Sequence, residues 1–115
     1  MRFLSMVRVQ ENTGQMPSER LMAEMGKLIE EMSAKGALVD TAGLRPTSEA
    51  VRLRNDHGKL SRTDGPFTEA REVIGGYAIL KADSMEEAIK ATNRFLEVHG
   101  DEWNVECEVR QLEEM

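Results

Sequence analysis

The middle of this chain reads TDGPFTEAREVIGGY from Thr63 to Tyr77. It combines an acidic turn, a Gly-Pro pair, a charged connector and a double glycine in one run. Glycine and proline give loops their special backbone, and functional groups are often held on such loops by a rigid scaffold. We therefore expect functional residues in this stretch and expect the rest of the chain to act as scaffold.

Upstream of this stretch, the pattern of apolar residues predicts strand, helix and strand in turn. The strands cover Arg2 to Val9 and Ala37 to Leu44. The helix runs roughly from Ser18 to Lys35, and Gly36 stands where a helix commonly ends. One apolar stripe along the helix is formed by Leu21, Met22, Met25, Leu28, Ile29 and Met32.

A β-hairpin is predicted between that second strand and the central stretch. Two short runs with strand-like patterns, Ala50 to Arg54 and Lys59 to Thr63, flank the turn sequence Asn55-Asp56-His57-Gly58. Alternation places Val51 and Leu53 inward and the neighbouring arginines outward.

Downstream, Val73 to Ala82 is the most apolar strand, and its double glycine predicts a bend, a bulge or the close approach of another backbone. A second helix ends at His99-Gly100, and Val105 to Arg110 alternates as a half-buried strand. The inward stripe of this helix is Met85, Ala88, Ile89, Thr92, Phe95, Leu96 and His99.

The second helix has two candidate capping boxes at its start. One pairs Asp83 with Glu86, and the other pairs Ser84 with Glu87. Both satisfy the spacing between an N-cap residue and a carboxylate three positions later, so the sequence leaves the choice open.

The order strand, helix, strand, hairpin, strand, helix, strand predicts an α+β, ferredoxin-like split βαβ sandwich with an inserted hairpin, in one domain spanning residues 1–115. Two helices cover one face of such a sheet. The first and fourth strands nevertheless carry apolar residues on both faces. We therefore expect a homodimer that packs through its sheet faces, since small homo-oligomers are mostly closed and two-fold.

Composition excludes several classes of partner. The net charge of −6 argues against nucleic-acid binding, which needs a basic face. No apolar run is long enough to cross a membrane, and no secretory signal is seen, so we expect a cytoplasmic protein. The single cysteine, Cys107, excludes an internal disulfide, fits a reducing compartment and lies in a strand pattern, so we interpret it as a buried hydrophobe.

Asp64 and His99 are the candidate catalytic residues. Asp64 precedes Gly-Pro, where a carboxylate commonly caps the following turn; the same donors would also hold it ionised as a general base. His99 lies on the inward stripe at the last turn of its helix, where it is either a capping and packing residue or a proton partner for Asp64. His57, at the hairpin tip, is expected to be solvated.

Three residues of the central stretch are candidate ligand contacts. Arg71 either pairs at the surface or holds an anionic ligand through its guanidinium, and Glu72 lies beside it on the same connector. Phe67 is either a plug under its loop or a ligand contact. The spacing of the double glycine does not fit a phosphate loop. With two histidines in the chain, no metal site and no cofactor are expected.

The residues Asp64-Gly65-Pro66-Phe67 resemble the DGPF motif of the YCII-related family. The similarity continues through Glu69-Ala70-Arg71-Glu72, Gly75-Gly76-Tyr77 and the start of the second helix, and it covers nearly the whole chain. It implies a dimeric ferredoxin-like fold of the dimeric α/β-barrel type, in a bacterial protein.

Members of the family differ in what they imply about function. One branch is similar to enzymes that eliminate chloride from chlorinated aromatic compounds, with a suspected His–Asp pair whose histidine lies on the first helix. Here Ser18 to Lys35 contains no histidine, so only the aspartate can be matched, to Asp64. Other members are encoded beside sigma factors, which suggests regulation. The sequence therefore leaves two functions open: acid–base chemistry on a small, anionic ligand near Asp64, or a non-catalytic accessory module.

Overall fold

The predicted order of strands and helices is confirmed by a computed structural model, which describes residues 1–11 and 13–114. Along the chain the elements are β1 (Arg2–Val9), α1 (Glu19–Ala34), β2 (Leu38–Gly43), the short 3₁₀ helix η1 (Thr47–Glu49), β3 (Val51–Asp56), β4 (Lys59–Asp64), β5 (Val73–Lys81), α2 (Met85–His99) and β6 (Glu106–Gln111).

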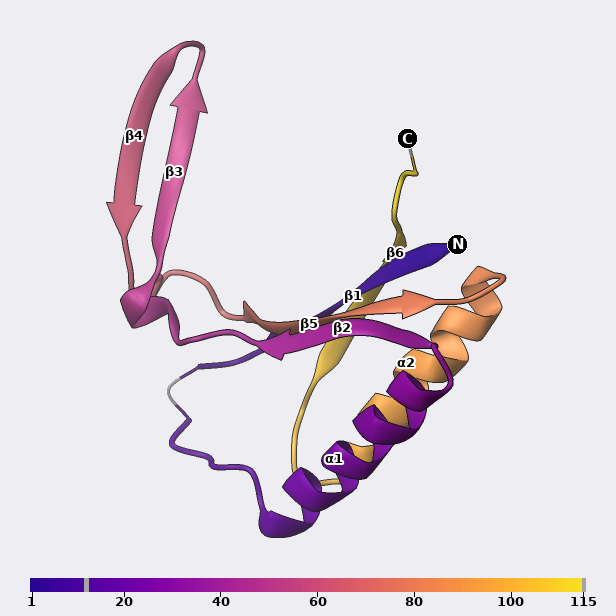
Figure 1. The fold of residues 1–115 in the computed structure, drawn as a ribbon. Helices are drawn as coiled ribbons and strands as arrows, with labels where there is room; N and C mark the ends of the chain where they lie inside the picture. The colour runs from indigo at the N-terminus through magenta and orange to yellow at the C-terminus, as the bar shows by residue number, and fades with distance from the viewer. Residues whose placement is uncertain (12, 115) are drawn as a thin grey trace.

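The main sheet has the strand order β2-β5-β1-β6, and each neighbouring pair is antiparallel. Both helices lie on one face of this sheet, and β3 and β4 form a separate two-stranded sheet that projects from it (Figure 1). This α+β arrangement is compatible with the predicted ferredoxin-like fold.

The core lies between the helices and the sheet. Phe3 of β1 and Leu80 of β5 are the largest side chains that are completely buried. From the helices, Leu28, Met32 and Ala88 pack against them. Met22 belongs to the predicted apolar stripe of α1 but is 57% exposed. The stripe of α1 is therefore narrower than its apolar composition suggests.

Both helices begin at a serine. Ser18 Oγ accepts a hydrogen bond from the Leu21 N–H at 3.1 Å, and Ser84 Oγ accepts one from the Glu87 N–H at 3.2 Å. The Glu87 carboxylate in turn accepts the Asp83 N–H at 2.9 Å. The structure thus makes Ser84, rather than Asp83, the N-cap of α2, with Glu87 reaching back to the residue before the cap.

The structure confirms the bulge predicted at the double glycine Gly75-Gly76. The β1–β5 register shifts after Val7, which pairs with Gly76, so that Arg8 pairs with Ile74 and Gly75 has no opposite residue. A Cβ added to Gly75 would lie 2.6 Å from Val9 Cγ2. Only glycine lets β1 and β5 approach this closely at the bulge.

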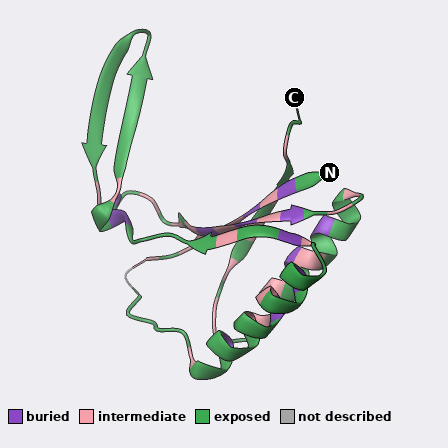
Figure 2. Cartoon of the chain, in the orientation of Figure 1, coloured by how far each residue is buried: buried purple, intermediate pink, exposed green. Residues whose placement is uncertain are grey.

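The predicted inward orientation of Val51 and Leu53 is wrong. Every residue of β3 and β4 is exposed (Figure 2), and the side chain of Leu53 is 78% exposed. The turn itself forms as expected, because His57 and Gly58 adopt the positive φ angles, 51° and 96°, that a tight hairpin turn requires. The alternation correctly predicts two faces of the hairpin, but no layer formed by residues 1–11 and 13–114 covers either face.

The main sheet also keeps one face clear of the helices. Leu4 and Met6 of β1 lie on it, opposite Ile79 and Tyr77 of β5 in the register. All four are only half-buried. We call these side chains the open sheet face.

Candidate functional site

The Asp64–Phe67 motif forms the base of the β3–β4 hairpin. Asp64 is the last residue of β4, and its exposed carboxylate accepts a hydrogen bond from Arg62 Nε at 2.8 Å. The Gly65 N–H donates to the Ala50 carbonyl at 2.8 Å and closes the hairpin. Asp64 is therefore paired with a side chain of its own strand, rather than with the backbone donors expected of a turn cap.

Thr47 joins three segments at this base. Its N–H and Oγ1–H both donate to the Glu11 carboxylate, at 2.9 and 2.5 Å, and its Oγ1 accepts the Phe67 N–H at 3.4 Å. A Cβ added to Gly65 would lie 1.6 Å from the Thr47 carbonyl oxygen. The glycine of the motif is thus required by close packing. We call Glu11, Thr47, Gly65 and Phe67 the hairpin anchor.

Phe67 is a buried plug, as one of the two sequence interpretations expected. Its side chain is 9% exposed, and the Arg52 guanidinium lies 3.7 Å from the centre of its ring. Arg52 Nη1 also donates to Glu69 Oε1 at 2.5 Å. These contacts connect β3 to the loop that follows β4.

A small pocket of about 290 Å³ lies beside the hairpin anchor. Phe67 and Arg71 line it together with Glu11 and Thr47, whereas Glu72 and Asp64 do not. Arg71 is exposed, and no hydrogen bond or ion pair to its guanidinium is seen among residues 1–11 and 13–114. Of the predicted ligand contacts, the structure brings together Phe67 and Arg71.

His99 lies in a different cavity, between the helix layer and the sheet. This interlayer cavity has a volume of about 260 Å³. Its walls are mostly apolar and come from both helices and from the sheet, as with Ile29, Phe95 and Ala78. His99 and Cys107 supply an imidazole and a thiol to its lining, beside the hydroxyl groups of Ser5 and Thr41. Tyr77 also lines the cavity, but its hydroxyl donates to Asp40 Oδ2 at 3.0 Å.

The hydrogen bond of His99 fixes its neutral tautomer. Nδ1 lies 2.8 Å from the Phe95 carbonyl oxygen, one helical turn earlier. A carbonyl oxygen only accepts, so Nδ1 carries the proton. In the neutral ring, Nε2 then holds the lone pair that can receive a proton.

Cys107 is not an activated nucleophile. Burial raises the pKa of its thiol, and a hydrogen bond with Ser5 opposes this only in part. A thiol with a raised pKa stays protonated at neutral pH, and the thiolate is the reactive form. Cys107 is half-buried, rather than buried as predicted.

A second hollow adjoins the interlayer cavity. It has a volume of about 560 Å³, and it shares Val7 and Gly75 with the interlayer cavity as lining residues. Trp103 is also in its wall, and the indole Nε1–H of this residue is buried without a hydrogen-bond partner among the described residues.

The structure thus places Asp64 and His99 apart within one chain. Asp64 is on the exposed hairpin base, and none of the cavities described above includes it in its lining. His99 is on α2, in the interlayer cavity. Their predicted partnership as base and proton partner therefore has no geometric support in the isolated chain.

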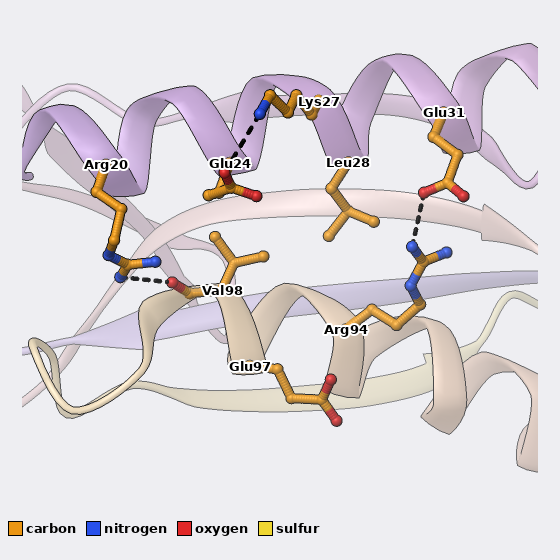
Figure 3. Close-up of a pocket in the computed structure, with 8 residues that line it drawn as sticks. All are labelled: Arg20, Glu24, Lys27, Leu28, Glu31, Arg94, Glu97 and Val98. Carbon is orange, nitrogen blue, oxygen red and sulfur yellow. Dashed lines mark hydrogen bonds and ion pairs between the residues drawn. The ribbon is translucent and has the colours of Figure 1, made fainter.

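A groove lined mainly by charged side chains runs between α1 and α2 on the outside of the molecule (Figure 3). Its charges are largely paired with one another: Arg20 donates to the Val98 carbonyl and to Glu102, and Arg94 Nη2 donates to Glu31 at 2.6 Å. Because these groups satisfy each other, we interpret the groove as a contact between the helices rather than a ligand site.

One of these pairs predicts a pH dependence of stability. Hydrogen bonds from Arg94 and then Lys35 lower the pKa of the Glu31 carboxyl. A lowered native pKa gives stability that is present above the unfolded pKa of about 4.3 and is lost as pH falls through the native value. We expect Glu31→Gln to have a lower Tm than the wild type at pH 7, and the difference to shrink towards pH 3. Thermal melts at low salt measure this.

The neighbouring Glu30→Gln variant is the control, since no ion pair to Glu30 is seen in residues 1–11 and 13–114. Its Tm should follow that of the wild type across this range. A Tm difference for Glu31→Gln that stays constant from pH 7 to pH 3 would contradict the role of the ion pairs.

Sequence reasoning missed Thr47 and Glu11, although they hold the hairpin anchor together. They are 36 positions apart, and neither stands in a pattern that points to the other. The proximity of Thr47 to a Gly-Leu-Arg-Pro turn gave no sign of its buried hydroxyl.

Two further findings concern metals and membranes. Within residues 1–11 and 13–114, no group of three or more His, Cys, Asp or Glu side chains is arranged to hold a metal ion. No helix in the same part of the chain has both the length and the apolar character needed to cross a membrane.

Two comparisons place the chain among known proteins. Residues 1–102 match the YCII-related domain family. A stretch of 71 residues is 32% identical to a protein of Rhizobium meliloti (strain 1021) described as uncharacterized protein R00369. That stretch covers 62% of this chain and 57% of the relative, so little more than half the length of the relative is matched.

Proposed function

Because this chain belongs to the YCII-related family, we propose that it binds a small, mainly apolar organic molecule in the interlayer cavity, where His99 exchanges a proton with it. The observation that carries the proposal is a histidine of fixed tautomer in the wall of an apolar cavity. Apolar walls with a few polar groups are typical of ligand sites.

The size of the cavity restricts the ligand. Its volume of about 260 Å³ is close to the lower end of the range for ligand pockets, about 300 Å³. A compact molecule with one polar or acidic group fits this space better than an extended cofactor. Ser5 and Thr41 line the wall, and the Thr41 hydroxyl, which donates to the Tyr77 carbonyl at 2.8 Å, can still accept a hydrogen bond from such a group.

The proposed acid–base chemistry depends on the hydrogen bond between His99 and the Phe95 carbonyl. With Nδ1–H held by the carbonyl, His99 can accept a proton at Nε2 and return it from the same atom. Asp64 takes no part in this proposal. Arg71, in the pocket beside the hairpin anchor, is the group best placed to hold an anionic ligand there.

We further propose that the working unit is a homodimer that packs through the open sheet face. Leu4, Met6, Tyr77 and Ile79 remain half-buried on the side away from the helices. Apolar surface in such a continuous layer is a common site of protein–protein contact.

The test of ligand binding is a thermal-shift screen of small aromatic and aliphatic acids on the wild type and on His99→Asn. The Asn amide nitrogen can replace Nδ1 as the donor to Phe95, but no group replaces Nε2. We expect a compound that raises the Tm of the wild type to lose most of that effect in the variant. Binding to the native state raises stability by mass action.

The other histidine supplies the matched control. His57 is at the hairpin tip with a fully exposed side chain and a positive φ angle that asparagine tolerates. His57→Asn should respond to the same compound as the wild type does. A compound that stabilises wild type and His99→Asn equally would exclude His99 from the site.

A non-catalytic accessory module, including one that serves transcriptional regulation, is the second candidate. The large exposed apolar side chains of the hairpin, Leu53 and Leu60, favour it, because a protein-binding module needs such a surface. The same screen separates the two functions: a protein that works only through its surface gives no compound whose effect depends on His99.

A further inference from the structure

The β3–β4 hairpin projects away from the body of the protein. The radius of gyration of the chain is 16.0 Å, against about 13 Å for a compact domain of this length. All residues of both strands are exposed, and Figure 1 shows the hairpin rising on the side of the main sheet that the helices leave uncovered. A two-stranded hairpin alone is marginally stable in water, so this one needs a surface to lie on.

The two faces of the hairpin differ in character. The register places Leu53 opposite Arg62 and Leu60 opposite Asn55, so Leu53, Leu60 and Val51 share one face. Their side chains are 78, 77 and 45% exposed. The other face carries the basic residues Arg52, Arg54 and Lys59. The face with the three apolar side chains, which we call the apolar face, also carries Asn55 and the Arg62–Asp64 ion pair, and it is uncovered.

The open sheet face offers the surface that this hairpin lacks. It presents Leu4, Met6, Tyr77 and Ile79 on the side from which the hairpin rises. The hairpin of the same chain stands away from this face (Figure 1), whereas the hairpin of a second copy facing it can lie on it. A two-fold pair would then cover both sheet faces and both hairpins with one kind of contact.

The charges of the hairpin also favour a second copy of this chain as its partner. The hairpin is basic, with Arg52, Arg54, Lys59 and Arg62 against Asp56 and Asp64.

The segment from β6 to the chain end is acidic, with Glu106, Glu108, Glu113 and Glu114 against Arg110. Glu106 and Glu108 pair with Arg8 and Met6 of β1, which puts them on the open sheet face. In a chain of net charge −6, this pairing also relieves the repulsion between two copies.

We propose that the β3–β4 hairpin is an arm that clasps a second copy of this chain. Its apolar face lies on the open sheet face of the partner, and Arg62, which shares that face of the hairpin with Leu53, lies on the side of the carboxylates on the partner's β6. This inference rests on the proposed homodimer and adds the segment that closes it.

The experiment measures mass in solution for the full chain, by light scattering and by sedimentation, on the wild type, Leu53→Asp/Leu60→Asp and Ile79→Asp. The wild type is expected at twice the 12.9 kDa of one chain. The arm variant is expected to weaken association at least about a hundredfold, since buried apolar anchors dominate interfaces. Added salt should weaken the wild-type dimer.

Met22→Asp is the control, because it adds the same charge at a side chain 57% exposed on α1, on the helix side of the sheet. It should remain a dimer. Circular dichroism checks that every variant keeps its helices.

A dimer that survives in Leu53→Asp/Leu60→Asp but not in Ile79→Asp would overturn the arm and leave the sheet-face dimer standing. A wild type that stays monomeric at micromolar concentration would overturn both.

Discussion

Gly65→Ala is expected to lower the free energy of unfolding by at least about 3 kcal/mol. The added Cβ would lie 1.6 Å from the Thr47 carbonyl oxygen and 3.2 Å from the Ala50 carbonyl oxygen. Both neighbours are backbone, so no side chain can rotate away. The anchor must open, and the bonds between Glu11 and Thr47 are put at risk with it. Urea unfolding at fixed protein concentration measures the loss.

Alanine substitutions at two other glycines are the controls for this prediction. Gly26 lies inside α1 and Gly43 ends β2, and a Cβ added to either meets nothing within 4 Å. Gly26→Ala should raise stability by about 1 kcal/mol, because alanine is the better helix former. Gly43→Ala should change it little. If Gly65→Ala proves as stable as these two, the motif glycine has no packing role and the anchor is misassigned.

The helices and strands of the main sheet could be predicted from the sequence, because the apolar residues of each repeat with the spacing typical of a helix or a strand. Alternation from Arg2 to Val9 and the helical spacing from Ser18 to Lys35 are local signals, and local signals survive without knowledge of the partners. The same rule failed on the hairpin, which no layer within the described part of the chain covers. Leu53 alternates as a buried residue does, yet it is 78% exposed.

The candidate site was predicted less completely, and the reason is distance along the chain. Asp64 and His99 are ionisable residues of a kind used in catalysis, but nothing in the sequence states whether they meet. The structure puts them in separate places and joins Thr47 to Glu11 instead. His99 was correctly expected to point inward, because its helical stripe is a local property and the residue lines the interlayer cavity.

The DGPF motif illustrates both sides of this limit. As a pattern of special backbone it predicts a functional loop, and the structure shows that this loop joins the hairpin to the body of the protein. The motif does not by itself reveal what its residues do. In the structure Asp64 pairs with Arg62, Gly65 permits a close approach of two backbone segments, and Phe67 is buried. Three of its four residues are thus explained by how the hairpin joins the body of the protein, before any ligand is considered.

Phe67→Ala is expected to cost about 3 kcal/mol, within the range for removing a buried aromatic side chain. The ring is 9% exposed, and its loss leaves a cavity at the hairpin base beneath the Arg52 guanidinium. Hydrogen exchange of the Gly65 amide, which donates to Ala50, reports locally on the same event. That amide should lose most of its protection in Phe67→Ala.

Arg52→Met separates packing from charge, because methionine keeps an apolar stem over the ring and removes the guanidinium. It should cost less than about 1 kcal/mol, the usual worth of an exposed cation–π contact. Equal losses for both variants would mean that the ion–ring contact holds the loop and that burial of the ring contributes little. If Phe67→Ala instead folds as well as the wild type but no longer responds to a ligand of the Arg71 pocket, Phe67 is a ligand contact. In that case the packing interpretation of the motif fails, since the hairpin would keep its place without its plug.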